Sequence, residues 1–383
     1  MIGPFSPARL ESVFQEHLDA GLEVGAAVSV WRGSEECLSL QGGFCDREGT
    51  TPWVAETLVP IWSATKGPAA ATTLLVLEKA GLSPHDRVGR VWPAFDRSDK
   101  RALTFAHLLS HQAGLSALDG EVPVEDYEAV VAALEEQVPH WELGTGHGYH
   151  PRTGGYLLDE VVRLLAGDRL GIVWHREIAT PFDLDVWIGL PESEDHRVAP
   201  LFAAKGISVS SDEKPFFQAY ADRESLTSRA FRSPAGLAAA TSMNQPEARR
   251  FGYPGMGGLA TASGLARFYA LLASGKILKP ETLREVRDFR QQGPDRTLRL
   301  ETAFSLGFMI DPVDGQGRKR RRHFGPNTGA FGHPGAGGSF AFADPASGTG
   351  FAYTMNQMEL CVLPGKRARA LVASGSDCLE AQS

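Results

Sequence analysis

The sequence predicts an α+β fold in which one antiparallel sheet is built from both ends of the chain. Segments with strand character occur near the N-terminus, at 25–31 and 37–42, and again at 338–344 and 350–356, which are predicted to form a hairpin. Residues 82–200 between them are mainly helical in pattern. Because the strands flank the helices in the chain, we expect an antiparallel sheet flanked by helices, with an inserted all-helical domain.

The domain division follows from this order. We predict a discontinuous α/β domain of residues 1–80 and 203–383, and a helical domain of residues 81–202. A chain of 383 residues can bury the core of one large domain or of two interleaved ones. Residues 203–256 are rich in Ser, Pro, Ala and aromatic residues, and this segment is the hardest to assign. A lid or an inserted flap fits its composition.

Local sequence patterns predict the helices and strands of the first 81 residues. Residues 8–21 place apolar side chains near helical spacing, and Arg32-Gly33-Ser34 supplies a turn between the first two strands. The apolar segment 57–62 then leads to Ser63 and to a long helix that ends at Gly81, where a helix C-cap is expected. The N-terminal part of the chain therefore reads as helix, two strands and helix.

The middle of the chain has capping signals. Thr104 can cap a helix that ends near His111. Further helices are predicted over 125–138 and 154–166, the second of them closed by Gly167. The Gly-rich loop 141–151 lies between these two helices.

The last third returns to strand character. A helix is predicted from Thr261 to Gly275, strands over 305–310 and 330–333, and a final helix from about Lys366. The basic run 318–322 is predicted to be a solvated loop or a hairpin tip, and a contact for an acidic partner or a membrane surface is the alternative.

Composition bounds the class of protein. Hydrophobic residues make up 43% of the chain and charged residues 22%, as in ordinary globular proteins, and the net charge of −8 does not favour nucleic acid. We find no run of about eighteen apolar residues and no basic-then-apolar leader, so we expect neither a membrane span nor a signal peptide. The four cysteines form no Cys-x-x-Cys pair. These features predict a cytoplasmic protein with reduced thiols and without a metal or cofactor.

The segment Ser63-Ala64-Thr65-Lys66 carries the strongest chemical signal. If Ser63 opens the helix, Lys66 lies one turn further on the same face, within reach of the serine hydroxyl. A lysine half-buried there loses part of its preference for the ammonium form and can act as a base. A second Ser-x-x-Lys begins at Ser211, but it is polar, Pro215 follows at once, and no helix is expected behind it. Ser63 is therefore the candidate nucleophile.

Two further segments can complete such a site. Tyr149 ends the Gly-rich loop and can carry a proton beside the amine, although a packing tyrosine is the simpler interpretation. Residues 333–338 place small side chains at a strand edge, where a substrate carbonyl can approach the backbone. An ordinary Gly-rich turn is the alternative for this segment.

Together, and in this order, the three segments resemble the motifs of the serine β-lactamase and penicillin-binding-protein superfamily. Ser63 to Lys66 resembles its Ser-x-x-Lys motif, Tyr149-His150-Pro151 its Tyr-x-Asn motif, and His333-Pro334-Gly335 its Lys-Thr-Gly motif. Two departures, Pro151 for the amide residue and His333 for the lysine, point to the branch of class C-like esterases called family VIII carboxylesterases. The resemblance spans about residues 8 to 375.

The resemblance implies roles for individual residues. Ser63 would be the acylated nucleophile, Lys66 and Tyr149 would handle the proton with the base left open, and the N–H groups of Ser63 and Ala336 would form the oxyanion hole. The expected substrate contacts are His333, Gly335, Trp62 and His150. The substrate would be a small-molecule ester. Alternatives are a β-lactamase, a D-amino-acid peptidase or an acyltransferase of the same superfamily, and a catalytically inactive binding or scaffold homologue.

Overall fold

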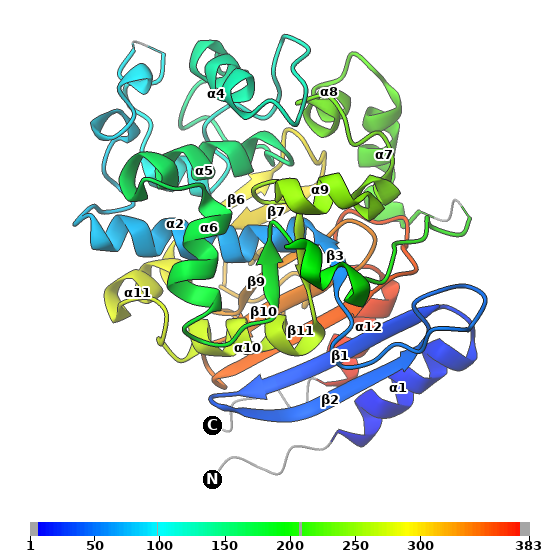
Figure 1. The fold of residues 1–383 in the computed structure, drawn as a ribbon. Coiled ribbons are helices and arrows are strands. Elements are labelled where there is room, and N and C mark those ends of the chain that lie inside the picture. The colour runs from blue at the N-terminus through cyan, green and yellow to red at the C-terminus, as the bar shows by residue number, and fades with distance from the viewer. Residues whose placement is uncertain (1–6, 98, 207–208, 376–383) are drawn as a thin grey trace.

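The structure is a computed structural model that describes residues 7–97, 99–206 and 209–375. Within these residues, an eight-stranded antiparallel sheet has the order β2-β1-β11-β10-β9-β8-β7-β6 (Figure 1). Its strands are β1 (Gly25–Arg32), β2 (Glu35–Gly43), β6 (Gln291–Pro294), β7 (Glu301–Phe304), β8 (Met309–Ile310), β9 (Phe331–Pro334), β10 (Phe340–Asp344) and β11 (Thr349–Met355). The predicted antiparallel α+β fold is confirmed.

The two ends of the chain meet inside this sheet. β1 pairs with β11 from Ala26 opposite Met355 to Arg32 opposite Thr349, so the N-terminal hairpin is joined to the C-terminal one. β10 and β11 form the predicted hairpin, and every residue of both strands is buried. A sheet buried on both faces needs helices on both faces.

Two helices pack directly against the sheet. α1 (Ala8–Asp19) contacts β2 and also α12 (Lys366–Ser374), while α10 (Ala262–Ala273) lies against β1, β10 and β11. Gly350 of β11 allows the closest of these approaches, because a Cβ there would lie 2.0 Å from the backbone oxygen of Ala266 in α10. The helices predicted over 8–21, from Thr261 and from Lys366 are all present.

Most of the remaining helices form the upper part of the molecule in Figure 1, whereas α11 lies lower, at the height of β9 and β10. They are α2 (Lys66–Lys79), α3 (Phe105–Leu109), α4 (Tyr127–Glu136), α5 (Thr153–Ala166), α6 (Leu170–Trp174), α7 (Lys214–Ala221), α8 (Leu226–Arg232), α9 (Pro246–Phe251) and α11 (Pro280–Asp288). α2 packs against α5 and α6 and also contacts β9, so it joins this part to the sheet. Thr104 caps α3, and Gly167 ends α5 in the left-handed conformation, as predicted.

A second, three-stranded sheet contacts α6. Its order is β3 (Val59–Trp62), β5 (Gly258–Ala260) and β4 (Val186–Ile188). β3 is the apolar segment that leads to Ser63, and β4 comes from the part of the chain predicted to be helical. The division into domains at residues 81 and 202 stays a prediction.

One expectation about the C-terminal third is wrong, and a second holds with one exception. The predicted strand 305–310 is interrupted: β7 ends at Phe304, and Gly307 turns the chain with a φ of +86° before the two residues of β8. The basic run begins on a hairpin as predicted, since Val313 pairs with Lys319 and the Arg318 side chain is 73% exposed. The exception is Lys319, whose side chain is buried with its Nζ 2.9 Å from Asp311 Oδ2. Lys319 also donates to two backbone oxygens, which compensates for its lost hydration.

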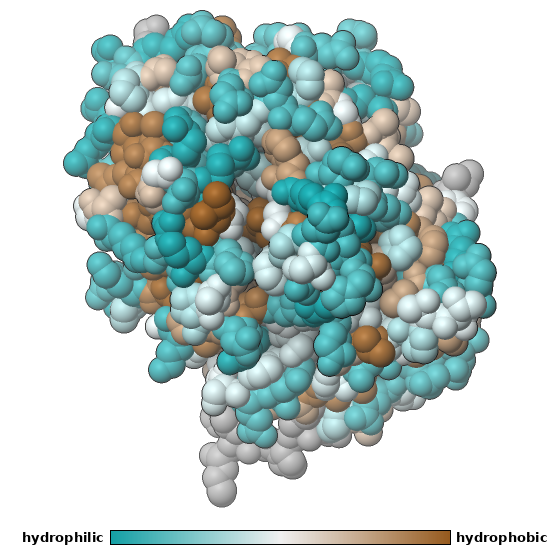
Figure 2. All heavy atoms as spheres, in the orientation of Figure 1, coloured by the Kyte–Doolittle hydropathy of each residue, from teal (hydrophilic) through white to brown (hydrophobic). Residues whose placement is uncertain are grey.

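The surface is mixed in character. Figure 2 shows a mainly hydrophilic face with apolar residues scattered over it. Among the described residues, no helix is both long and apolar enough to cross a bilayer. Cys37, Cys45 and Cys361 carry free thiols, whereas Cys378 lies outside the described residues. The cytoplasmic location stays a prediction.

Candidate active site

Ser63 sits at a sharp turn between β3 and α2. Residues Ser63–Thr65 form a 3₁₀ turn and α2 begins at Lys66, so Ser63 precedes the α-helix instead of opening it. Trp62 has a φ of 45°, a strained conformation for a residue with a side chain. Thr65 holds this turn, because its hydroxyl donates to Trp62 O and accepts from Gly258 N at 2.8 Å. The turn leaves the Ser63 side chain partly exposed.

The Lys66 amine lies beside the serine hydroxyl. Its Nζ is 3.5 Å from Ser63 Oγ and donates to the backbone oxygens of Pro151 and Gly255, both at 2.8 Å. Burial lowers the pKa of Lys66 to about 7. A neutral amine has two N–H groups and one lone pair. With both N–H groups on the two carbonyls, the lone pair is left for the Ser63 hydroxyl.

Tyr149 packs beside this pair. Its ring stacks on Phe304 with 6.0 Å between centroids and on His333 with 5.8 Å, and Lys66 Nζ lies 5.0 Å from its centroid. Burial raises the pKa of Tyr149, and the neighbouring Ser63 hydroxyl offsets only part of that rise. The Tyr149 hydroxyl is buried and has no full hydrogen bond within the described part of the chain. It therefore keeps its proton near neutral pH and is free to exchange it.

The turn between β9 and β10 approaches the nucleophile. A Cβ on Gly335 would lie 2.1 Å from Ile61 O, so only glycine lets this turn pack against β3. Gly335 N donates to Ser339 O at 2.6 Å and closes the turn that carries Ala336. Among the described residues, the N–H groups of Ser63 and Ala336 have no hydrogen-bond acceptor. Two free N–H groups of this kind suit an oxyanion.

His333 lies behind the Tyr149 ring as a neutral side chain. It is 1% exposed, and its Nδ1 lies 2.7 Å from Pro334 O, which makes Nδ1 the protonated nitrogen. Burial, reinforced by the charge of Lys66, lowers the pKa of His333 to about 3. The position that the superfamily motif fills with lysine therefore carries no positive charge here.

Two other expected substrate contacts, His150 and Trp62, already use their polar ring atoms in hydrogen bonds within the protein. His150 Nε2 accepts from Leu115 N at 3.0 Å, and Nδ1 lies 2.6 Å from Gly148 O, so both ring nitrogens are already occupied. This geometry favours a structural role for His150. Trp62 donates its indole N–H to Ala240 O at 3.1 Å and can offer only its ring to a substrate.

The second Ser-x-x-Lys has the same local structure. Ser211–Glu213 form a 3₁₀ turn and α7 follows from Lys214, so the expectation that no helix follows is wrong. The reason is that Pro215 falls in the first helical turn, where its missing N–H costs little. Ser211 and Lys214 are both exposed, and Ser211 Oγ donates to Asp212 at 3.2 Å. Burial and two carbonyl partners, not local structure, distinguish Lys66.

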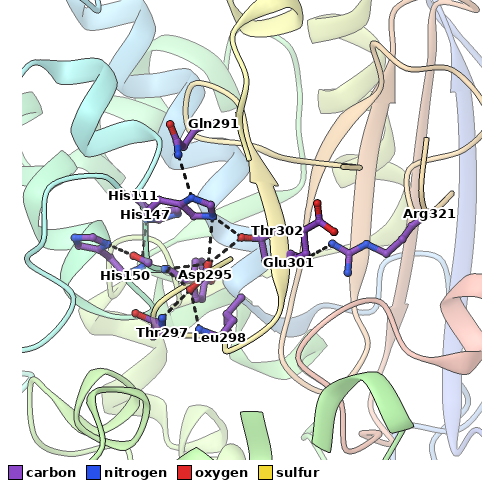
Figure 3. Close-up of polar contacts among 12 residues, drawn as sticks. His111, His147, His150, Gln291, Asp295, Thr297, Leu298, Glu301, Thr302 and Arg321 are labelled. Carbon is purple, nitrogen blue, oxygen red and sulfur yellow. Dashed lines mark hydrogen bonds and ion pairs between the residues drawn. The ribbon is translucent and has the colours of Figure 1, made fainter. Parts of the chain in front are cut away.

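Sequence reasoning missed the groups that support the site. Gly255, whose carbonyl holds Lys66, lies in the segment 203–256 that had no clear assignment. Asp295 accepts a hydrogen bond from Tyr149 N at 3.1 Å and is surrounded by further polar side chains (Figure 3). In the sequence, Gly293-Pro294-Asp295 reads only as a turn. No local pattern shows that this turn lies behind Tyr149.

The fold and this constellation of Ser63, Lys66 and Tyr149 define a serine enzyme of the β-lactamase type. The chain belongs to the Beta-lactamase family, which matches residues 10–374. It is 31% identical over 348 residues to the Esterase/beta-lactamase LipL of Mycobacterium tuberculosis, covering 87% of this chain and 77% of that protein.

Comparison with solved structures places the chain in the same family. A family VIII carboxylesterase is 31% identical with a TM-score of 0.84, covering 98% of this chain and 99% of that one. A penicillin-binding-protein homologue from Caulobacter crescentus is 32% identical with a TM-score of 0.82, at the same coverage of 98% and 99%. The predicted superfamily is confirmed.

Proposed function

We propose that the protein is a serine esterase that hydrolyses small carboxylic esters through an acyl-enzyme on Ser63. The observation that carries this proposal is the buried Lys66 amine, 3.5 Å from Ser63 Oγ and held by two carbonyls. This amine has no acidic partner among the described residues, so it is available as a base near neutral pH. The esterase names of two relatives support the same activity.

The geometry supports a definite order of proton transfers. Lys66 Nζ accepts the proton of the Ser63 hydroxyl while Oγ attacks the ester carbonyl, and the oxygen that becomes negative lies against the N–H groups of Ser63 and Ala336. The Tyr149 hydroxyl gives its proton to the departing alkoxide as the ester C–O bond breaks, and it regains one from the Lys66 ammonium. Water then attacks the acyl carbonyl and passes a proton to the same pair. The bond between the acyl carbon and Ser63 Oγ breaks, Oγ takes a proton back from the pair, and the carboxylic acid leaves.

Two features favour esters over β-lactams. His333 is neutral and buried, so it offers no charge to a substrate carboxylate. Pro151 has no side-chain donor, and its carbonyl is occupied by Lys66. A short ester has neither a carboxylate nor an amide that needs these contacts. A β-lactamase, peptidase or acyltransferase activity remains the alternative within the superfamily.

Labelling with a fluorophosphonate followed by mass spectrometry tests the proposal. We expect one adduct, on Ser63, that is lost in Ser63→Ala and retained in Ser211→Ala. Ser211 is the matched control because it shares the Ser-x-x-Lys sequence and the 3₁₀ turn but is exposed. A protein that forms no adduct on Ser63 would be the inactive homologue instead.

A further inference from the structure

A chain of mostly buried polar side chains leads to the backbone N–H of Tyr149. It starts at Gln291 of β6, continues through His147 and Thr302 of β7, and ends at Asp295 (Figure 3). The side chains of His147 and Asp295 are 1% and 0% exposed. Polar groups this deeply buried are costly unless all are satisfied, so the network needs an explanation.

The hydrogen bonds of this chain all run in one direction. The Gln291 amide nitrogen can only donate, so His147 Nδ1, 3.2 Å away, is the acceptor and carries no proton. Neutral His147 therefore has its proton on Nε2 and donates it to Thr302 Oγ1 at 2.7 Å. Burial lowers the pKa of His147, in agreement with the neutral form. Thr302 then has its own hydrogen free, and it donates this to Asp295 Oδ2 at 2.9 Å.

The Asp295 carboxylate accepts several hydrogen bonds. Besides Thr302, it accepts from the backbone N–H groups of Thr297 at 2.8 Å, Leu298 at 2.7 Å and Tyr149 at 3.1 Å. The Tyr149 N–H also lies 3.2 Å from the second carboxylate oxygen. Burial raises the pKa of Asp295, and His147 and the surrounding N–H groups offset part of that rise. Because all its hydrogen-bonding neighbours donate, the carboxylate form is the one that satisfies them. The chain therefore ends in an acceptor that holds the backbone N–H of Tyr149.

We propose that Asp295, oriented by Thr302 and His147, is a positioning residue that sets the place of the Tyr149 hydroxyl relative to Ser63 and Lys66. The inference rests on the proposed function, in which Tyr149 exchanges the proton. Stacking on Phe304 and His333 fixes the plane of the Tyr149 ring but allows it to slide within that plane. The backbone anchor on Asp295 removes this freedom. Burial is the main cause of the raised pKa of Tyr149, and the negative charge of the Asp295 carboxylate adds to it.

Thr302→Val is the sharpest test, because it removes one hydroxyl at nearly constant shape. We expect kcat on a short-chain ester to fall roughly tenfold, with KM changed less than twofold, since small misplacements of a catalytic group are this costly. Thr302→Ser keeps the hydroxyl and should restore most of the rate. Asp295→Asn, which turns one acceptor into a donor facing other donors, should lose more than Thr302→Val. Thermal unfolding of each variant shows that it is folded.

The decisive comparison uses the Tyr149→Phe background. If the network acts through the Tyr149 hydroxyl, Thr302→Val should cost close to nothing further once that hydroxyl is gone. An equal loss in both backgrounds, or no loss in the wild type, overturns the inference. The rate at which a fluorophosphonate labels Ser63 is read in parallel. A protein that labels but hydrolyses no ester contradicts the proposed function alone, and the same comparison of labelling rates still decides the role of Asp295.

Discussion

The Nζ atom of Lys66 lies 3.5 Å from Oγ of Ser63, and its other two polar contacts are backbone carbonyls. Carbonyl oxygens accept hydrogen bonds but carry no full charge, so they hold the amine without forcing it to stay protonated. Tyr149, in contrast, is held in its protonated form by burial. This contrast supports our proposal that Lys66 is the base and Tyr149 the proton donor, a choice that the sequence leaves open.

The first prediction concerns pH. Because burial lowers the pKa of Lys66 to about 7, from 10.5 for a free lysine, the fraction of neutral amine rises as the pH increases through 7. We therefore expect kcat/KM for a neutral ester to climb tenfold per pH unit below about pH 7 and to level off above it. Initial rates between pH 5 and 9 measure this. Activity that falls as the pH rises through 7 would show that the ammonium form is the active one.

The second prediction concerns the proton-handling pair. Lys66→Ala and Tyr149→Phe should each lower kcat/KM by a factor on the order of 10²–10⁴, the range for losing a general base or acid. The double variant should lose much less than the product of the two, because the residues act as a unit. Lys79→Ala, an exposed lysine on the same helix, should stay within about twofold and serves as the control. Additive losses in this cycle would mean that the two residues act independently.

Gly335 provides the third prediction. A Cβ at this position would lie 2.1 Å from Ile61 O, so Gly335→Ala must push the turn that carries Ala336 away from Ser63. We expect kcat to fall by a factor on the order of 10², as for the loss of one oxyanion donor. Gly315→Ala is the matched control, since a Cβ there meets open space. Equal activity of the two variants would show that the N–H group of Ala336 is not part of the oxyanion hole.

Much of the fold is predictable because its signals are local. Gly167 stops α5 in the left-handed conformation, and the β10–β11 hairpin is a run of apolar residues on each side of a turn. The strand expected over 305–310 fails for a tertiary reason. Its Gly307 packs against α2, where a Cβ would lie 2.3 Å from Ala70 Cβ, and this contact turns the chain. Apolar composition alone does not distinguish a strand from such a buried turn.

In the active site, too, local contacts can be predicted from the sequence and long-range contacts cannot. Ser63 and Lys66 are neighbours in the sequence, and their contact follows from helical spacing. The acceptors of the Lys66 amine do not, because Pro151 and Gly255 reach it from distant parts of the chain. The spacing of Ser211 and Lys214 is identical, and only the tertiary environment leaves that pair exposed. Burial, which sets the chemistry of the lysine, is a property of the fold.

The central claim is that this site is built for esters, and the ratio of two specificity constants tests it most directly. An anionic β-lactam meets the neutral His333 and the donor-free Pro151, and it loses a charge-assisted hydrogen bond worth about 1.5–3 kcal/mol. That corresponds to roughly a ten- to hundredfold loss, which a short-chain ester does not suffer. We predict that purified protein hydrolyses p-nitrophenyl butyrate with a kcat/KM well above that for benzylpenicillin. Faster turnover of benzylpenicillin than of p-nitrophenyl butyrate would contradict the account and identify a β-lactamase instead.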